Sequence, residues 1–403
     1  MKILQLCNKV PYPVNDGGAI AVMNLSQSLT RLGHHVSILA MRTPKHNTGI
    51  RDIPEELQQD IDFHLVPVDT TLRPLRLIIN LLFSATPYNA ERFMDKSFEH
   101  ELAELLHKEK FDVVQLEGLY LVPYIPVIRK YSSSCIALRA HNIESEIWSR
   151  IREVTVNRLK RFYFGILSKR MEEFELGSLN LYDLLVPITE RDAATFRGLG
   201  NVKPMKVIPT GINEKNFRRD HSSSKSRNKL FFIGALDWIP NQEGLIWFLE
   251  KVWRDLVKQY PSVEFHVAGR NAPAWLEKRC KESGWEYHGE VENAHEFMDT
   301  HDIMVVPLFA GSGMRIKIVE AMARSKLIIT TPIGAEGLGV EQGKHLIIAH
   351  SAADFIASLG KLINDEDFFA KIQENAFVYT RQEFNNMQLT KELIAFYRKH
   401  SSC

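Results

Sequence analysis

Apolar runs about as long as buried strands recur along the first half of the chain, separated by polar and amphipathic stretches. Helical spacing of apolar residues lies between several of them, for example over 19–32 and 98–109. Apolar strands that alternate with helices are typical of a parallel sheet covered by helices. The pattern predicts strands over 2–7, 35–40, 63–68, 111–116, 135–139 and 184–187.

The same pattern restarts in the second half of the chain. A stretch of small polar residues, SSSKS at 222–226, predicts a linker. Beyond it a helical pattern covers 241–258, and we expect strands over 229–235, 264–269, 302–308 and 326–332. The two series predict an α/β protein with two Rossmann-like domains, which we place at 1–210 and 211–384. We expect the tail, 385–403, to form a helix from about residue 387 to residue 400 that packs back on the first domain.

The charge balance, the cysteines and the lengths of the apolar runs exclude several classes of protein. The 403 residues include 50 Lys and Arg and 49 Asp and Glu, so no overall charge favours nucleic acid as a partner. Four cysteines without CxxC spacing predict reduced thiols and neither a disulfide framework nor a zinc site. No apolar run reaches the roughly 20 residues that span a bilayer, and the N-terminus reads as a strand rather than a signal peptide. We therefore expect a cytoplasmic location.

A glycine-rich turn followed by charged residues is the main candidate site. The stretch LFAGSGMRIKIVEAMA, at 308–323, follows a predicted strand, and ligands of doubly wound sheets bind beyond the carboxyl ends of strands. Glycine amides, a helix start near Met314 and two cations suit a diphosphate, while a carboxylate suits the hydroxyls of a ribose. The alternative is an ordinary glycine turn before a solvated basic helix face. The residues concerned are Gly311, Ser312, Gly313, Met314, Arg315, Lys317 and Glu320.

Further candidates lie at other strand ends. Gly17 and Gly18 begin a predicted helix after the first strand and lack the GxGxxG spacing of dinucleotide enzymes. They are either a tight turn or amides that approach a donor phosphate, and Asp16 before them is expected to cap the helix. Arg270 follows a strand and is either a phosphate ligand or a surface cation. His141 follows another strand, where an isolated histidine is more often structural.

Several motifs together resemble the retaining GT-B glycosyltransferases of family 4, most closely the bacterial polysaccharide-type members. The resemblance covers nearly the whole chain and rests on motifs that are weak one by one. The motifs are VPYPVNDGGAIAVMNLSQSLTRLGHHV (10–36), RAHNIES (139–145), IPTGIN (208–213), IGALDWIPNQEGLIWFLEKVW (233–253), VAGRNAP (267–273), YHGEVEN (287–293) and GSGMRIKIVEAMARSKLIITTPIGAEGL (311–338).

The resemblance implies two Rossmann-like domains facing a central cleft, the first for the acceptor and the second for a nucleotide diphosphate sugar. It implies that His141 faces the donor sugar and that Gly234 and the backbone near Val291 contact the nucleotide. Glu144 is expected to cap the helix after His141. Many members carry a second glutamate where this chain has Ser312, and its absence bears on which sugar is recognised.

The implied reaction transfers a sugar to an acceptor hydroxyl with retention at the anomeric carbon. We expect Arg315, Lys317 and backbone amides to stabilise the leaving diphosphate. The resemblance implies no metal and no other cofactor. Two other functions remain open from the sequence: a nucleotide-sugar epimerase on the same fold, and a nucleotide-sugar binding protein without catalysis.

Two stretches of the first domain combine cations with apolar or aromatic residues. They are LRPLRLIINLLF (72–83) and RLKRFYFGILSKR (158–170). Such segments dock on anionic membranes, which would suit a lipid-linked acceptor at the inner face of the membrane. The alternative is a pair of core-packing helices with solvated basic faces. The sequence leaves open the sugar, the nucleotide base, the acceptor and the oligomeric state.

Overall fold

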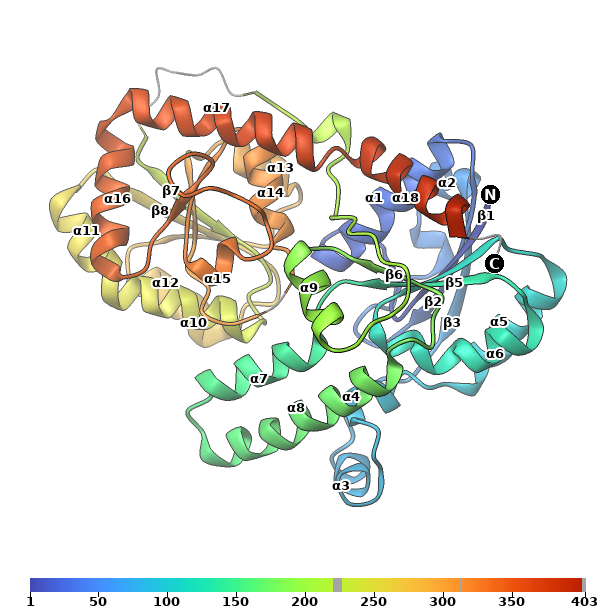
Figure 1. Cartoon of the computed structure of the whole chain (residues 1–403). Coiled ribbons are helices and arrows are strands. Elements are labelled where there is room, and N and C mark those ends of the chain that lie inside the picture. Colours follow the sequence, from blue (N-terminus) through green and yellow to red (C-terminus); the bar gives the residue numbers. More distant parts are fainter. Residues whose placement is uncertain (220–226, 312, 401–403) are drawn as a thin grey trace. The chain divides into compact units, whose positions relative to one another are not determined.

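The computed structural model describes residues 1–219, 227–311 and 313–400, and its chain divides into two compact units (Figure 1). The first unit contains Met1–Gly211 and the last helix of the chain, and the second contains Ile212–Gly311 and Arg315–Asn385. The predicted linker at 222–226 and the candidate residue Ser312 lie outside the described residues.

The first unit is built on a parallel sheet with the strand order β3-β2-β1-β4-β5-β6. The chain runs outward from β1 to β3 and then returns to place β4 on the other side of β1, so the strand order reverses between β1 and β4. The strand predictions for this half are confirmed, with ends that shift by a few residues. The strands are β1 (Lys2–Cys7), β2 (His35–Arg42), β3 (Ile61–Pro67), β4 (Val113–Glu117), β5 (Cys135–Ala140) and β6 (Leu184–Pro187).

Helices cover this sheet, and their apolar faces form two buried clusters with the strands. The last helix, α18, lies along α1, where the Asn386 side chain donates a hydrogen bond to the Asn24 carbonyl at 2.6 Å. Tyr397 of α18 is fully buried and donates to Gln115 of β4 at 2.7 Å. The helices are α1 (Gly17–Arg31), α2 (Glu55–Asp60), α3 (Pro74–Phe83), α4 (Tyr88–Glu91), α5 (Lys96–Lys108), α6 (Ile125–Tyr131), α7 (Glu144–Val154), α8 (Arg158–Ser178), α9 (Glu190–Gly198) and α18 (Asn386–His400).

Helices α7 and α8 form an antiparallel pair on the first unit, and α3 lies near α8 (Figure 1). The Arg170 guanidinium of α8 donates to the Leu81 carbonyl of α3 at 2.7 Å, which joins the two predicted basic-apolar segments. In the part of the chain that the structure describes, no helix combines the length and the apolar character needed to traverse a bilayer.

The second unit repeats the topology of the first, with the strand order β12-β11-β10-β7-β8-β9. Its strand order reverses between β7 and β10. The four predicted strands are confirmed, while β9 and β12 were missed. The sequence of β9, EYHG, lacks a continuous apolar run because its side chains are half-buried or exposed, and β12 has two residues. The strands are β7 (Lys229–Ile233), β8 (Glu264–Ala268), β9 (Glu286–Gly289), β10 (Ile303–Val306), β11 (Leu327–Thr330) and β12 (Ile347–Ile348).

The predicted helix over 241–258 is interrupted and begins two residues earlier than expected. It consists of α10, a π-helical turn (Leu249–Trp253) and α11, and Pro240 occupies the first turn, where a proline costs no hydrogen bond. Gly244 packs against the end of β10, since a Cβ atom there would lie 1.9 Å from the Pro307 carbonyl oxygen. The helices are α10 (Ile239–Phe248), α11 (Arg254–Gln259), α12 (Ala274–Glu282), α13 (Ala294–Asp299), α14 (Ile316–Ala323), α15 (Pro332–Ala335), α16 (Ala352–Asn364) and α17 (Glu366–Glu383).

The chain enters the second unit and returns from it at neighbouring points. At its own ends, the Ile212 amide donates to the Phe384 carbonyl at 2.7 Å. In the first unit, a Cβ atom on Gly211 would lie 2.5 Å from the Cα atom of Asn386. Residue 211 is therefore a glycine at a close backbone contact, and the second unit is an insertion whose two ends lie side by side.

Candidate functional site

In the second unit, three loops meet where the strand order reverses, which is the usual ligand position in a doubly wound sheet. Gly234 follows β7, and a Cβ atom there would lie 3.2 Å from the Nζ atom of Lys317 on α14. A Cβ atom on Gly269, after β8, would lie 1.9 Å from the Gly234 carbonyl oxygen. The two glycines thus allow the ends of β7 and β8 to approach closely beside a lysine.

Lys317 is held in a partly apolar setting. Its Nζ atom lies 3.3 Å from Oδ1 of Asn241 and 4.1 Å from the centre of the Phe232 ring. Burial, with a smaller contribution from the charge of Arg315, lowers the pKa of Lys317 to about 7. The side chain is therefore ready to take up a proton when an anion arrives, because an opposite charge favours the protonated form.

Arg315 lies directly before α14 and is buried, with its guanidinium carbon 5.9 Å from the centre of the Trp238 ring. Gly311 has a φ of +116°, and a Cβ atom there would lie 2.7 Å from Nη2 of Arg315. Gly311 thus provides both the backbone conformation and the space that Arg315 occupies. Helix α14 begins at Ile316 rather than near Met314, which is half-buried in the preceding loop beside Gly313, whose φ is +75°.

Glu320 lies one turn into α14 and faces a residue that the sequence did not single out. Its Oε1 atom is 3.4 Å from Nε2 of His295 on α13, and both side chains are largely buried. A weak hydrogen bond of this length orients the carboxylate without using all of its acceptor capacity. The oxygen atoms that remain suit a pair of hydroxyl groups.

The two remaining candidates of this unit lie in the next loops along the same edge of the sheet. Arg270 follows β8, and its carbonyl accepts from the Leu236 amide at 2.9 Å, so the loops after β7 and β8 are tied together. Val291 lies in the loop between β9 and α13 and is half-buried. The structure thus gathers Gly234, Arg315 and Lys317 at one point, with Arg270 and Val291 in adjoining loops.

In the first unit, His141 follows β5 and pairs with a buried carboxylate. Its Nε2 atom lies 2.7 Å from Oε2 of Glu117, the last residue of β4, and Arg139 lies 3.5 Å from the same oxygen. Burial raises the pKa of Glu117, but the charge of Arg139 and the hydrogen bond with His141 outweigh it and hold that pKa below its usual value. The ionised Glu117 therefore fixes the orientation of the His141 ring.

Glu117 is a functional candidate that the sequence reasoning missed. The available signal was a charged residue at the end of a mostly apolar strand, VVQLE, in a position where a carboxylate is rarely buried without a partner. Its partner Arg139 lies in β5, the next strand in the sheet, and His141 follows that strand directly, so only the strand order brings them to Glu117.

Gly17 and Gly18 form the first turn of α1, and Asp16 caps this helix as expected. The Asp16 carboxylate accepts from the Ala19 amide at 2.9 Å and pairs with Lys9 at 2.6 Å. Lys9 is a further cation beside this helix start, since a Cβ atom on Gly18 would lie 3.4 Å from its Nζ atom. The turn therefore combines the positive end of a helix with a lysine.

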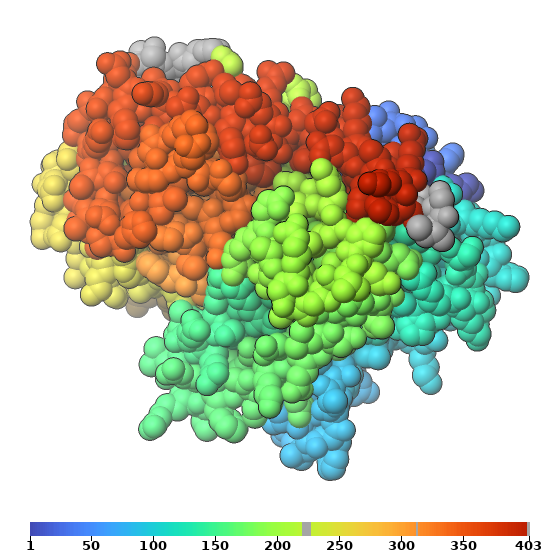
Figure 2. Space-filling view, viewed as in Figure 1, coloured from blue at the N-terminus to red at the C-terminus, as the bar shows by residue number. Residues whose placement is uncertain are grey.

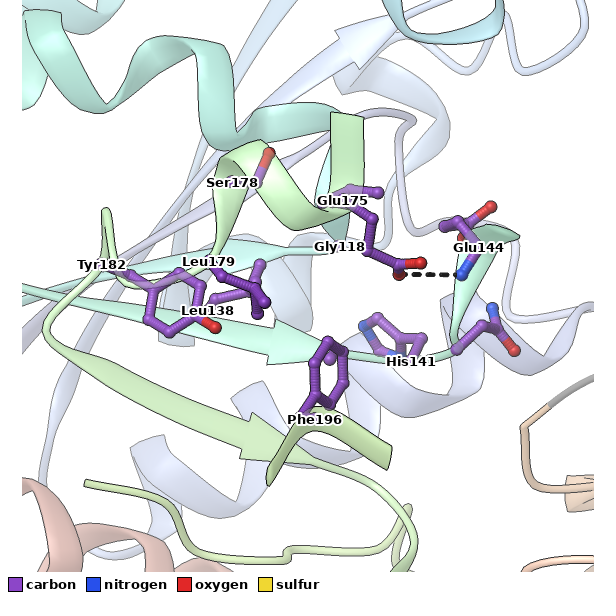
Figure 3. Close-up of a pocket in the computed structure, with 12 residues that line it drawn as sticks. Gly118, Leu138, His141, Glu144, Glu175, Ser178, Leu179, Tyr182 and Phe196 are labelled. Atoms are coloured by element: carbon purple, nitrogen blue, oxygen red, sulfur yellow. Dashed lines mark hydrogen bonds between the residues drawn. The ribbon is translucent and has the colours of Figure 1, made fainter. Parts of the chain in front are cut away.

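Glu144 lines a pocket beside His141 (Figure 3). The helix cap that the sequence predicted for Glu144 is wrong. The Glu144 side chain does not cap α7; its carboxylate accepts a hydrogen bond from Tyr120 at 2.8 Å. The cap comes from Glu175 of α8, which accepts from the amides of Glu144 and Ser145 at 3.0 and 3.2 Å. A distant carboxylate thus replaced the local one that the sequence suggested.

Burial raises the pKa of Glu144 to about 7, and it also raises the pKa of Glu175. The pocket is lined by these two carboxyl groups, by His141 and Asn142, and by apolar side chains of β5, of α9 and of the segment just after α8. It thus places a carboxyl group that titrates near neutral pH beside the candidate catalytic histidine.

The candidate residues fall on both units. Gly17, Gly18 and His141 belong to the first unit, whereas Gly234, Arg270, Val291, Gly311, Arg315, Lys317 and Glu320 belong to the second. Each set lies at the carboxyl edge of its own sheet, and the second set combines close-packed glycines, two cations and one carboxylate.

Sequence models of two known families match the two units. The model described as Glycosyltransferase Family 4 matches residues 15–216, half of the chain, and the model described as Glycosyl transferases group 1 matches residues 227–365. The chain belongs to glycosyltransferase family 4. Its two units are the two Rossmann-like domains of the GT-B fold, as the motifs predicted.

Relatives of this family 4 glycosyltransferase include a 44.6 kDa protein in the cps region of Klebsiella pneumoniae. The two are 22% identical over 96% of this chain and 97% of the relative. Among solved structures, Anabaena Alr3699/HepE in complex with UDP is 14% identical with a TM-score of 0.70, over 99% of this chain and all of the other. Sucrose-phosphate synthase from Thermosynechococcus elongatus is 14% identical with a TM-score of 0.73, over 99% of both chains.

Proposed function

We propose that this glycosyltransferase moves a sugar from a nucleoside diphosphate sugar to a hydroxyl of a glycan or lipid-linked acceptor, with retention at the anomeric carbon. The observation that carries the proposal is the group of Gly234, Arg315 and Lys317 where the second sheet reverses its strand order. The relative from a cps region supports a role in cell-surface polysaccharide synthesis. The structural neighbour with bound UDP supports a nucleotide-sugar donor.

In the proposed reaction the second unit stabilises the leaving group. Breaking the anomeric bond moves negative charge onto the diphosphate, and Arg315 carries a fixed charge beside it. Lys317, whose pKa is about 7, takes up a proton when the diphosphate binds and then stabilises the negative charge that develops. Preorganised donors of this kind each lower a barrier by about 3–4 kcal/mol in well-studied oxyanion sites. In this proposal, side-chain cations rather than a metal balance the charge, and Glu320 holds the ribose hydroxyls.

In the first unit, His141 orients the donor sugar. Glu117 accepts a hydrogen bond from its Nε2 atom and holds the ring in a fixed orientation for this role. The positive end of α1 at Gly17 and Gly18 adds backbone donors for the diphosphate. The acceptor hydroxyl attacks from the side of the leaving phosphate, which takes up its proton, and this path retains the anomeric configuration.

A nucleotide panel tests the donor site. Calorimetry with UDP, GDP and ADP should show a preference for one diphosphate, and Glu320→Ala should weaken its binding because the hydroxyl contacts are lost. Glu282→Ala, which removes an exposed carboxylate of α12 in the same unit, is the matched control and should bind like the native chain. A folded sample that binds none of the three would refute the nucleotide-sugar donor.

The stereochemistry and the acceptor need a second assay. The product formed with a membrane extract should have the same anomeric configuration as the donor, measured by proton NMR. Conversion of the donor sugar without any acceptor would identify an epimerase instead, and binding without turnover in every extract would identify a nucleotide-sugar binding protein.

We also propose that the first unit docks on the inner face of an anionic membrane through α3 and the start of α8. The alternative of core-packing helices does not describe α3, whose apolar side chains are mostly exposed: 71% for Leu75, 67% for Leu82 and 83% for Phe83. At the start of α8, Leu159 and Phe162 are exposed by 82% and 71%.

The charges beside these apolar side chains favour an anionic surface. Arg73 and Arg76 flank the apolar residues of α3, and Arg158, Lys160 and Arg161 accompany those of α8. Figure 2 shows the α3 segment, in light blue, at the surface of the first unit. Apolar side chains among cations bind anionic bilayers through both burial and charge.

Vesicle flotation tests the membrane contact. The native chain should float with vesicles that contain phosphatidylglycerol and should remain unbound with phosphatidylcholine alone. The triple variant Leu75→Ser, Leu82→Ser and Phe83→Ser should stay at the bottom of the gradient. Val202→Ser, which removes an exposed apolar side chain elsewhere in the first unit, should float like the native chain. Equal flotation of the triple variant would refute this surface.

A further inference from the structure

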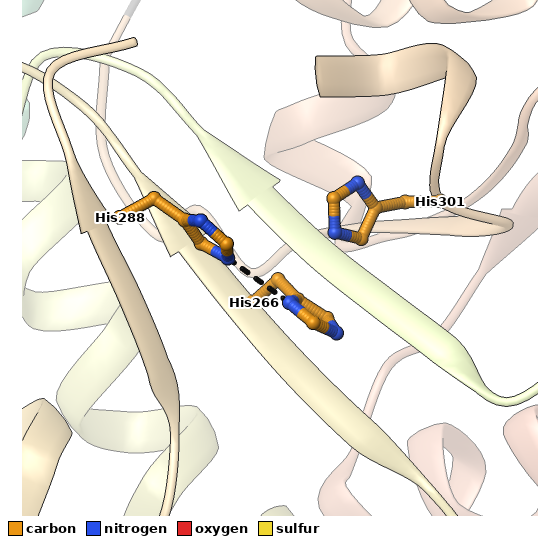
Figure 4. A group of neighbouring side chains, drawn as sticks. All are labelled: His266, His288 and His301. Carbon is orange, nitrogen blue, oxygen red and sulfur yellow. Dashed lines mark hydrogen bonds between the residues drawn. The ribbon is translucent and has the colours of Figure 1, made fainter.

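Three histidines that are far apart in the sequence meet on one face of the second sheet (Figure 4). His266 lies in β8, His288 in β9, and His301 between α13 and β10. One ring nitrogen from each lies within 4.8 Å of the other two. His266 and His301 are buried, whereas His288 is exposed to solvent. Two of the three rings are thus held in the protein interior, and the third is accessible to solvent.

A bulge in the sheet brings His288 into this group. The register pairs Val267 with Tyr287 and Ala268 with Gly289, so His288 is the extra residue between two paired positions. A bulge redirects the side chain of the extra residue. In Figure 4 the rings of His288 and His266 point toward each other from neighbouring strands, and their Nε2 and Nδ1 atoms lie 3.0 Å apart.

Hydrogen bonds assign the protons on the two buried rings. Nδ1 of His301 lies 2.6 Å from the Phe297 carbonyl, which can only accept, so Nδ1 carries the proton and Nε2 has a free lone pair. Nε2 of His266 lies 3.2 Å from the Glu264 carboxylate, so the proton is on Nε2 and the lone pair on Nδ1. A ligating histidine commonly donates its other N–H to a carbonyl or a carboxylate in this way.

We propose that His266, His288 and His301 form a binding site for a divalent transition metal of the zinc type, with Nδ1 of His266 and Nε2 of the other two as ligands. In a tetrahedral zinc site, with Zn–N distances of 2.0–2.1 Å, ligand nitrogens lie about 3.3 Å apart. The observed nitrogens lie 3.0 Å apart in one pair and within 4.8 Å in all. Binding needs the His288 proton to move to Nδ1, and the open side of His288 leaves the fourth position to water.

Aromatic side chains lie beside the buried histidines of the group. The rings of Phe231 and Phe297 pack against His301 with centroids 5.6 and 4.3 Å away, which shields one side of the group.

A metal at this position would hold both ends of the segment between His288 and His301 against the sheet. His288 lies just before the loop that contains Val291, and His301 lies just after α13, which carries His295 against Glu320. The site lies within the sheet face rather than among the candidate donor residues, so we assign it a structural role. Its test is independent of the proposed glycosyl transfer.

Metal content and cobalt spectroscopy on the untagged full chain test the site. After chelation, the native chain should take up one equivalent of Co²⁺ with the visible bands of a tetrahedral complex, and Zn²⁺ should displace them. Zn²⁺ in large excess over its Kd should also raise the melting temperature by about 5 °C or more.

His288→Asn is the main variant, because an exposed side chain can be replaced without disturbing the core. It should weaken Co²⁺ binding by more than about a hundredfold, beyond the roughly 10–100-fold loss seen when only an outer partner of a ligand is removed. His301→Phe should do the same. His350→Asn, an exposed histidine of the same unit, should bind like the native chain. A native chain without the tetrahedral bands, or equal binding by His288→Asn, would overturn the proposal.

Discussion

Replacing Lys317 by glutamine tests whether this lysine is the group that becomes charged when a diphosphate binds. With a pKa of about 7, about a quarter of the Lys317 side chains are protonated at pH 7.5 in the unbound protein. A diphosphate beside the ammonium raises that pKa well above 7.5, so binding should take up about 0.7–0.8 proton per chain.

The loss of affinity in Lys317→Gln can be worked out from the same value. A hydrogen bond to a charged group contributes about 1.5–3 kcal/mol, and protonating Lys317 at pH 7.5 costs about 0.8 kcal/mol. The net loss is about 1–2 kcal/mol, or about five- to thirtyfold in Kd. The affinity of the native chain should also rise about twentyfold from pH 8.5 to pH 6.5. The reason is that the pKa of Lys317 in the unbound protein is lowered to about 7, so the lysine gains its proton over this pH range.

Calorimetry in three buffers of different ionisation enthalpy measures the proton uptake directly. The preferred diphosphate from the nucleotide panel is the ligand, and Lys317→Gln gives the baseline that includes every other titrating group. Lys258→Gln, which changes a largely exposed lysine of α11, should match the native chain. If Lys317→Gln takes up as many protons as the native chain and keeps the same pH slope, another group receives the proton and the role of Lys317 is wrong.

Two further predictions concern the first unit. Glu117→Gln should lower the free energy of unfolding by about 3 kcal/mol in urea titrations, because the buried charge of Arg139 loses its partner. The double variant Glu117→Gln, His141→Ala should have about the same kcat as His141→Ala alone, because Glu117 acts through His141. If the losses of kcat in the two single variants add up in the double variant, this role of Glu117 is wrong. The pKa of Glu144 is raised to about 7, so the folded chain keeps a proton that the unfolded chain loses above about pH 4.5. The free energy of unfolding should therefore fall by up to about 3 kcal/mol between pH 4.5 and pH 7, and Glu144→Gln should lose this part of the pH dependence; an unchanged slope would refute the assignment.

The strands of both sheets were readable in the sequence wherever burial on both faces left a continuous apolar run. The strand β9 was missed because half-buried and exposed side chains alternate along it, and β12 is too short to leave a pattern. The π-helical turn after Phe248 was also not predictable, since the apolar spacing continues through it. Local patterns thus identify the buried strands, and the two strands that were missed lie at the two edges of the second sheet.

The site residues divide in the same way. Arg315, Lys317 and Glu320 were found because they stand close together in one motif. Glu117 and the three histidines were missed because their partners come from other strands, and a sequence does not give strand order. The cap expected from Glu144 is supplied by Glu175, which is 31 residues away. Contacts between distant segments are what the sequence alone leaves undetermined.

The neighbouring ends of the second unit bear on how such enzymes diversify. A segment whose two ends touch can be replaced without stretching the chain that surrounds it, as inserted domains tolerate. Here the host sequence stops at Gly211 and resumes at Asn386, and the close backbone contact between these residues belongs to the host. Exchange of the inserted segment between related genes would therefore replace the whole second unit in one recombination event and leave the first unit unchanged.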